Sequence, residues 1–193
     1  YAKAKRMVVS TYQAVSGAGV KGIMELQQQL AALAHGKEVE IQTFQHQIAY
    51  NLIPQIGSFD ENGYSSEEMK MQNEGRKILN SPELAVNCTC VRVPILRSHS
   101  ESIMVEFEQP IDVEKARELL ATAKGVKLVD DPKSNQYPMP LDTTDQDLVY
   151  VGRIRKDIST QANALSFWCC GDQVRKGAAT NAVQIAELLI EEL

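Results

Sequence analysis

The sequence lacks several features that would assign the chain to a membrane or nucleic-acid class. It contains no apolar run that approaches the length of a membrane span and no basic-then-apolar leader. Its 20 basic and 25 acidic residues are interspersed, and the formal charge is -5. This pattern argues against a nucleic-acid footprint or a basic membrane-binding patch. We therefore expect a cytoplasmic protein with no nucleic-acid or membrane partner.

The sequence also lacks cysteine spacing suited to a disulfide framework. Its four cysteines form two tight groups, Cys88 with Cys90 and Cys169 with Cys170. Cysteines this close rarely bridge each other, and zinc-binding pairs prefer two to four intervening residues. A four-thiolate zinc site remains an alternative, but we expect reduced thiols in two buried strands and no metal site.

The chain has neither an initial methionine nor an internal repeat. The segment 1–6 runs almost directly into strand-like residues 7–9, so we expect a fragment of a longer protein. The 193 residues are 44% hydrophobic and 23% charged, which is ordinary for a globular domain with a real core.

Hydrophobic periodicity predicts an α+β fold. Alternating and β-branched runs predict strands, and apolar residues spaced by three and four predict helices. Ser65 with Glu68 forms a capping-box pattern, and the helix that follows has an unusually polar face for one that packs on a core. We expect a mostly antiparallel mixed sheet with helices on one face, the other face being free for a second subunit. The predicted strands are residues 7–11, 86–93, 102–108, 126–129, 148–156 and 164–170, and the predicted helices are 20–34, 66–79, 113–123 and 175–193.

The segment from Arg92 to His99 carries two side chains that suit a functional site. Pro94 lies between them and should end the strand, so the guanidinium and the imidazole flank a rigid bend. An arginine there suits a carboxylate or phosphate, and a histidine in a polar loop with an exposed ring suits proton transfer. The alternatives are a cross-strand ion pair and a surface histidine without a role.

For other polar residues, an ordinary structural role is an alternative to a functional one. Glu67 and Lys70 share a helical face, where an ordinary surface ion pair is the alternative to a binding role. Arg153 and Lys156 suit an anion, or simply the solubility of an edge strand. Cys88 in a strand interior is poorly placed for a reactive thiolate.

Five separated blocks of the sequence resemble the aspartate-β-semialdehyde dehydrogenase family, in that family's order and spacing. The resemblance implies a glyceraldehyde-3-phosphate-dehydrogenase-like C-terminal domain that binds substrate and dimerises. It divides the chain into a connecting strand and cofactor-facing loop (1–19), the substrate-binding and dimerisation domain (20–173), and a helix that packs on a dinucleotide-binding domain (174–193). The blocks are residues 10–17 (STYQAVSG), 67–70 (EEMK), 89–94 (TCVRVP) with 99–101 (HSE), 151–157 (VGRIRKD) and 176–181 (KGAATN).

The family reductively dephosphorylates L-4-aspartyl phosphate to L-aspartate 4-semialdehyde with NADPH, a step of lysine, threonine and methionine biosynthesis. The resemblance therefore implies a homodimer or tetramer and NADP as the cofactor. It also implies a role for each matched residue. His99 would be the general acid/base, Gln13 would orient the substrate, Arg92 would bind its carboxylate, Glu67 (with Glu68 as the alternative) its ammonium and Lys70 the phosphate, while Ser16, Gly17 and Asn181 would approach the cofactor.

The resemblance also implies what this chain does not carry. The family's nucleophilic cysteine and its Gly-rich dinucleotide-binding fold lie upstream of the block that opens this chain. Asn87-Cys88-Thr89 mimics the nucleophile motif, but Cys90 and Arg92 are the residues in register with the family's strand. We expect the isolated chain to be inactive. A non-catalytic dimerisation or interaction module of the same family is the main alternative, and an N-acetyl-glutamyl-phosphate reductase is a weaker one.

Overall fold

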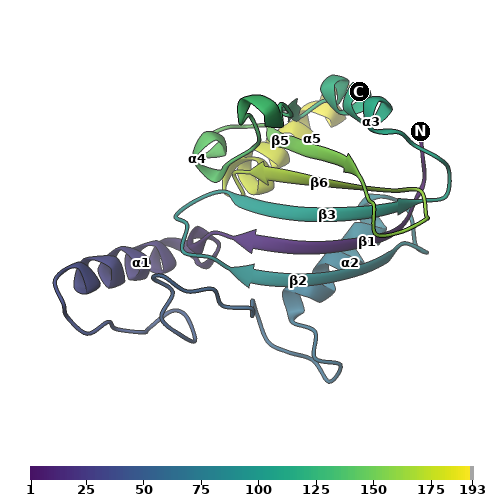
Figure 1. Ribbon diagram of the computed structural model, residues 1–193. Coiled ribbons are helices and arrows are strands. Elements are labelled where there is room, and N and C mark those ends of the chain that lie inside the picture. Colours follow the sequence, from purple (N-terminus) through teal and green to yellow (C-terminus); the bar gives the residue numbers. More distant parts are fainter. Residues whose placement is uncertain (192–193) are drawn as a thin grey trace.

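The computed structural model describes residues 1–191 and is built around one six-stranded sheet (Figure 1). Two neighbouring pairs, β1 with β2 and β4 with β5, are parallel, and the other three pairs are antiparallel. This confirms the expected α+β class and the mostly antiparallel sheet. The strand order is β2 (Ala85–Arg92), β1 (Ala4–Gln13), β3 (His99–Phe107), β6 (Ala164–Gly171), β5 (Val149–Lys156) and β4 (Val126–Leu128).

One face of the sheet is covered by α2 (Ser66–Ile78) and α3 (Val113–Thr122). Successive strand residues point to opposite faces, so alternate residues of each strand form the core. The core under α2 includes Val9, Cys88, Cys90 and Ile103, and it continues through Phe107 and Phe167 into the core under α3.

Helix α2 begins with the predicted capping box. Glu68 N–H donates to the Ser65 hydroxyl, and the Glu68 carboxylate accepts from Ser65 N–H. The expectation that the polar face would keep this helix off the core is wrong, because Met71 packs on the core and Glu68 is buried. The buried carboxylate accepts the N–H of Cys90 at 2.9 Å, so its burial is compensated by hydrogen bonds.

Helix α1 (Gly19–Ala34) extends away from the sheet and carries a small core of its own (Figure 1). A 3-10 turn, Val15–Ala18, joins it to β1. The loop after α1 folds back onto it through Phe44, Ile48 and Ile53, which pack on Leu26. The region beside the end of β1 is thereby closed on one side.

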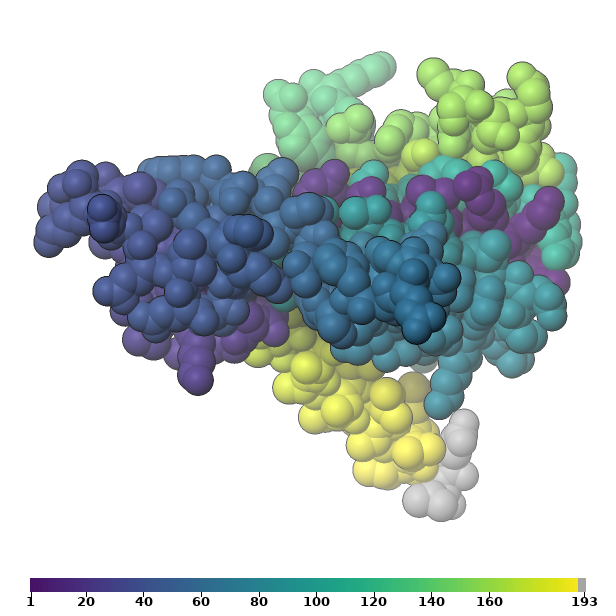
Figure 2. Space-filling model, turned by 90° about the horizontal axis from the view of Figure 1, so that it is seen from below, coloured from purple at the N-terminus to yellow at the C-terminus, as the bar shows by residue number. Residues whose placement is uncertain are grey.

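The predicted final helix is interrupted. A π-helical turn, Arg175–Ala179, precedes α5 (Thr180–Glu191), and the rest of the predicted helix, residues 192–193, lies outside the described residues. Figure 2 shows α5 extending from the body of the molecule. Its apolar side chains Val183, Ile185, Leu188, Leu189 and Ile190 are all more than half exposed. The proline-rich segment between β4 and β5 contains a 3-10 turn, Pro132–Ser134, and the one-turn helix α4 (Pro140–Thr143).

The second face of the sheet is covered on its β5–β6 side by the segment that contains α4, from which Pro138 O accepts from Trp168 Nε1 at 3.0 Å, so the helices do not all lie on one face as expected. Tyr12 and Trp168 form a tilted aromatic pair there, with ring centroids 5.3 Å apart. Val8, Val91 and Met104 alternate onto the same face and are half-buried. Ser10, Thr89 and Ser102 lie between them, and a mixed apolar and polar surface of this kind suits contact with another protein surface.

Candidate active site

Three strand ends bring the predicted polar residues together. Because β1 and β2 are parallel, their last residues, Gln13 and Arg92, lie side by side in register. Strand β3 runs antiparallel to β1 and pairs Ser100 with Tyr12, so its first residue, His99, lies next to Gln13. All three side chains therefore emerge at one end of the sheet, on the face that the helices cover.

The backbone of Ala14 holds both Arg92 and His99. Its carbonyl accepts from Arg92 Nη1 at 2.7 Å, and its N–H donates to His99 Nδ1 at 3.1 Å. Arg92 is 8% exposed, and burial lowers the pKa of its guanidinium while the Glu67 carboxylate opposes that shift. An arginine side chain remains charged under such a shift, so Arg92 contributes a positive charge whose position is fixed by the bond to Ala14.

Gly17 is the residue that lets the loop after β1 approach this pair. A Cβ atom on Gly17 would lie 2.6 Å from Arg92 Nη1 and 3.4 Å from His99 Nε2. The first distance is far inside van der Waals contact, so any larger residue would displace the guanidinium. Glycine therefore serves here for close approach, and it leaves the Nε2 edge of the imidazole uncovered by a side chain.

The prediction that His99 is an exposed loop residue is wrong. His99 begins β3, and its ring is mostly buried between the loop after β1 and the sheet. Burial and the neighbouring Arg92 cation lower the pKa of His99 to about 4, against weaker effects of Glu67 and Asp172. At neutral pH the ring is uncharged. Because Nδ1 accepts from Ala14 N–H, the proton of the neutral ring is on Nε2.

Helix α2 brings a carboxylate and an ammonium to the same end of the sheet. Gln13 Nε2 donates to Glu67 Oε1 at 3.2 Å, and Lys70 Nζ lies 3.0 Å from Glu67 Oε2. Burial raises the pKa of Glu67, but the hydrogen bonds from Lys70 and Gln13 outweigh it and leave that pKa below its usual value. Glu67 is thus the acid that faces the site, whereas Glu68 serves the cap and β2.

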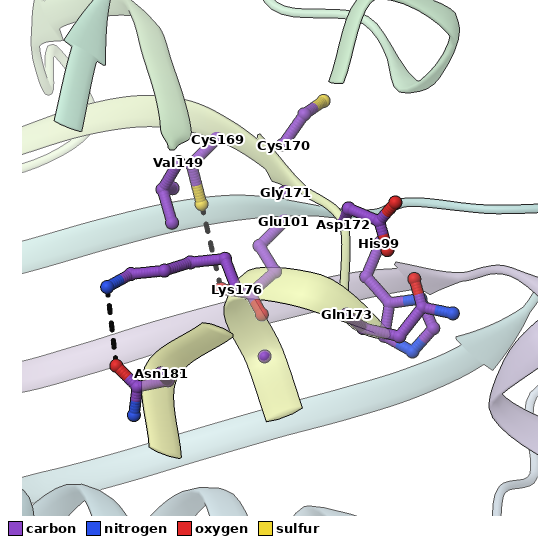
Figure 3. A pocket seen from close by; sticks show the side chains of 11 residues that line it. His99, Glu101, Val149, Cys169, Cys170, Gly171, Asp172, Gln173, Lys176 and Asn181 are labelled. Carbon is purple, nitrogen blue, oxygen red and sulfur yellow. Dashed lines mark hydrogen bonds between the residues drawn. The ribbon is translucent and has the colours of Figure 1, made fainter. Parts of the chain in front are cut away.

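The predicted cofactor-facing residues occupy two places. Ser16 lies in the turn after β1, where its N–H donates to Leu96 O and its hydroxyl accepts from Gln173. Asn181 is on α5, where its side chain accepts from Lys176 at 3.3 Å. A pocket of about 370 Å³ connects this end of α5 to His99 (Figure 3).

Two acids around this pocket were missed from the sequence. Glu101 follows His99 by two positions, so it points to the same side of the sheet and lines the pocket. Burial raises the pKa of its carboxyl, and the Cys169 thiol lies 3.7 Å away. Asp172 is fully buried and accepts from Arg97 at 2.6 Å, which fixes the bend before His99. The spacing from His99 was the available signal for Glu101.

Cys88 and Cys90 lie in the core and outside the pocket beside His99. Their sulfurs are 3.6 Å apart, and hydrogen bonding of the Cys88 thiol to Cys90, together with burial, raises the pKa of Cys88. Across residues 1–191, no group of three or more His, Cys, Asp or Glu side chains is arranged to hold a metal ion. Within the same residues, no helix has both the length and the apolar character needed to cross a bilayer.

Comparison with known proteins gives a consistent match. The family model described as "Semialdehyde dehydrogenase, dimerisation domain" matches residues 1–176. An aspartate-semialdehyde dehydrogenase of Prochlorococcus marinus is 52% identical over 186 residues, which are 96% of this chain and 54% of that protein. The chain thus spans about half the length of the curated relatives it matches.

Solved structures match over the same region. Aspartate semialdehyde dehydrogenase II of Vibrio cholerae, complexed with ASA, is 48% identical with a TM-score of 0.94, over 98% of this chain and 56% of that one. The aspartate semialdehyde dehydrogenase with NADP from Candida albicans is 24% identical with a TM-score of 0.68, over 97% and 50%, and this likeness concerns the fold alone.

Proposed function

Because this chain belongs to the semialdehyde dehydrogenase family through its dimerisation domain, we propose that it is the substrate-binding and dimerising part of an NADP-dependent aspartate-semialdehyde dehydrogenase. The whole protein would convert L-4-aspartyl phosphate, NADPH and a proton into L-aspartate 4-semialdehyde, NADP⁺ and phosphate in the cytoplasm, for lysine, threonine and methionine biosynthesis. The observation that carries the proposal is the convergence of Gln13, Arg92 and His99 at one end of the sheet beside Glu67 and Lys70.

Each charge at this end has a counterpart on the substrate. The planar fork of Arg92 binds the α-carboxylate, because several of its five N–H donors remain available after the bond to Ala14. The ionised Glu67 binds the ammonium. Lys70, whose side chain is 60% exposed, binds the leaving phosphate through Nζ. This set of opposite charges fits a free amino acid with an acyl phosphate and favours aspartyl phosphate over an N-acetylated substrate.

His99 offers a hydrogen-bond donor to the reacting group. Its neutral ring carries its proton on Nε2, the edge that Gly17 approaches without a side chain, so Nε2–H can donate a hydrogen bond to a substrate oxygen. To act as the general acid/base, the ring must cycle between its neutral and imidazolium forms, and an anionic substrate bound to Arg92 would offset the charge that disfavours the imidazolium. Gln13 orients the acyl group between His99 and Arg92.

The residues beside the pocket fit the nicotinamide end of NADP. Asn181 lines the pocket of about 370 Å³, Gly17 approaches His99 of the same pocket from the loop after β1, and the Ser16 hydroxyl accepts from Gln173 of its wall. A flat ring with a polar substituent suits such a lining. The bound cofactor supplies the hydride for the reduction, and these residues orient it.

The exposed face of α5 fits a further part of the same proposal. Its five exposed apolar side chains have no covering element among the described residues, and the relatives are about twice as long as this chain. We assign this face, and with it residues 174–191, to contact with the dinucleotide-binding half of the whole protein.

The free face of the sheet fits the homodimer. Tyr12 and Trp168 form an aromatic pair on it, with Val91 and Met104 on the same face, and the family model concerns dimerisation. Replacing Met104 with Arg should bury an unpaired charge at the contact and convert dimers to monomers, as measured by light scattering. The exposed Lys127→Arg variant is the control. Dimers of unchanged stability in Met104→Arg would contradict this assignment.

A direct assay tests the activity. Aspartate semialdehyde, phosphate and NADP⁺ are supplied to the whole protein that carries this chain, and NADPH formation is followed by absorbance. We expect activity in the whole protein and none in the isolated chain, because Cys169, the half-buried cysteine of the pocket, has a pKa raised by burial and by Glu101. No activity in the whole protein would favour a non-catalytic dimerisation module.

A further inference from the structure

Thr11 lies in β1 beside Gln13 and contacts no part of the substrate in the proposed function. It precedes Gln13 by two positions in β1, so both side chains point to the same face of the sheet. Thr11 is 2% exposed, and its Oγ1 lies 2.9 Å from Gln13 Oε1. A buried hydroxyl needs a partner, and Gln13 is the partner found here.

The direction of this hydrogen bond follows from Glu67. The Glu67 carboxylate is ionised and can only accept, so the Gln13 atom 3.2 Å from it must be the amide nitrogen. The amide oxygen therefore faces Thr11, and the Thr11 hydroxyl must donate to it. Lys70, 3.0 Å from the other Glu67 oxygen, keeps the carboxylate charged and anchors the chain of contacts.

This chain of contacts decides how the Gln13 amide is oriented. The oxygen accepts from Thr11 with one of its two lone pairs, while the nitrogen uses one of its two N–H groups on Glu67 and keeps the other. Rotating the amide by half a turn would set its oxygen against the carboxylate and its nitrogen against the hydroxyl. Gln13 therefore holds a free N–H in a fixed orientation, ready to donate to a ligand.

We propose that Thr11 is a positioning residue that fixes the orientation of the Gln13 amide, so that Gln13 donates to an oxygen of the acyl substrate. The proposal rests on the proposed function, since it names how one residue of that site is oriented. A threonine suits the position because its branched side chain packs well in a buried strand while its hydroxyl supplies the donor.

The test uses isosteric and conservative variants of the whole protein. Thr11→Val keeps the shape and removes the donor, and Thr11→Ser keeps the donor. We expect Thr11→Val to lower kcat/KM for the semialdehyde roughly 10- to 100-fold, as loss of an oriented hydrogen bond in the transition state does. Thr11→Ser should restore most of that loss. If Thr11→Val does not fold, the same comparison is made between Thr11→Ala and Thr11→Ser.

A double-mutant cycle separates positioning from packing. In a Gln13→Ala background there is no amide to orient, so adding Thr11→Val should lower kcat/KM by less than about twofold. A full additional loss in that background would overturn the proposal, and so would wild-type kinetics in Thr11→Val. Activity in Gln13→Ala equal to wild type would also overturn it. A wild-type protein without any dehydrogenase activity would instead refute the proposed function.

Discussion

Two buried polar clusters in this chain are built in opposite ways. On α1, Gln29 donates to Glu25 and to the Glu40 carbonyl, and its oxygen accepts from the N–H groups of Ile48 and Ala49. All four hydrogen bonds that a glutamine side chain can make are therefore made within the protein. At the end of the sheet, by contrast, each polar side chain makes only part of its possible set.

The second cluster is held firmly but incompletely. Arg92 uses one donor on Ala14, His99 uses Nδ1 on the same residue, and Gln13 keeps an N–H free. A cluster whose hydrogen bonds are all made within the protein stabilises the fold and has no free donor or acceptor for a ligand. A cluster held through one contact per group is pre-positioned and still able to bind. The comparison separates structural from functional polar groups by how many of their hydrogen bonds the protein itself supplies.

Removing the Arg92 guanidinium should have the largest effect. Arg92→Met in the whole protein should lower kcat/KM by roughly 30- to 4000-fold, the range expected when one partner of a buried charge pair is lost. Steady-state kinetics with the semialdehyde measure it. Arg155→Met, which removes an exposed guanidinium from β5, is the matched control and should leave activity near wild type. A loss below threefold in Arg92→Met would remove Arg92 from the site.

The pH dependence of stability should reveal the buried imidazole. The pKa of His99 is about 4 in the folded chain, below its ordinary value of 6.5, so the unfolded chain binds more protons between these values. His99 therefore contributes stability fully above pH 6.5, and the contribution is lost as the pH falls towards 4. The resulting loss in the free energy of unfolding is on the order of 3 kcal/mol.

Urea unfolding of the chain at pH 7 and at pH 4.5 measures the contribution of His99 to the free energy of unfolding. The wild type should lose more stability between the two pH values than His99→Asn, in which an amide oxygen can still accept from Ala14 N–H. Since carboxylates titrate in both proteins, only the difference between them counts. Equal losses in the two proteins would show that His99 is not desolvated.

The Gln29 cluster on α1 should behave in the reverse way. Gln29→Leu leaves the N–H groups of Ile48 and Ala49 without their acceptor, so the free energy of unfolding should fall by roughly 1–3 kcal/mol. Activity of the folded whole protein should stay near wild type. Gln28→Leu, at an exposed position of the same helix, is the control for both measurements. A loss of activity without a loss of stability in Gln29→Leu would contradict a purely structural role for this cluster.

The smallest effect on stability should come from Lys70. Its ion pair with Glu67 is exposed on the lysine side, so Lys70→Met should change the free energy of unfolding by less than about 1 kcal/mol. The KM for phosphate in the assay should nevertheless rise several-fold relative to Lys77→Met, an exposed lysine of the same helix. An unchanged KM for phosphate would assign Lys70 to the surface alone.

The elements of this fold were predictable where local signals are strong. Helix α2 begins at its capping box, and α3 begins at Asp112, whose side chain accepts from Lys115 N–H. The strands follow their alternating pattern to within a few residues. The errors fall where distant parts of the chain meet: β3 begins earlier than predicted because Ser100 pairs with Tyr12, and the last helix is broken at the π-helical turn.

The sequence by itself determined the residue types of the site and, through periodicity and caps, the elements that carry them. Those signals are local, because they depend on neighbours within a few residues. Only the tertiary structure decided that Gln13, Arg92 and His99 meet, since strand register joins residues far apart in the chain. It also decided that Glu67 and not Glu68 faces Gln13, and that His99 is neutral, because helix orientation and desolvation are properties of packing.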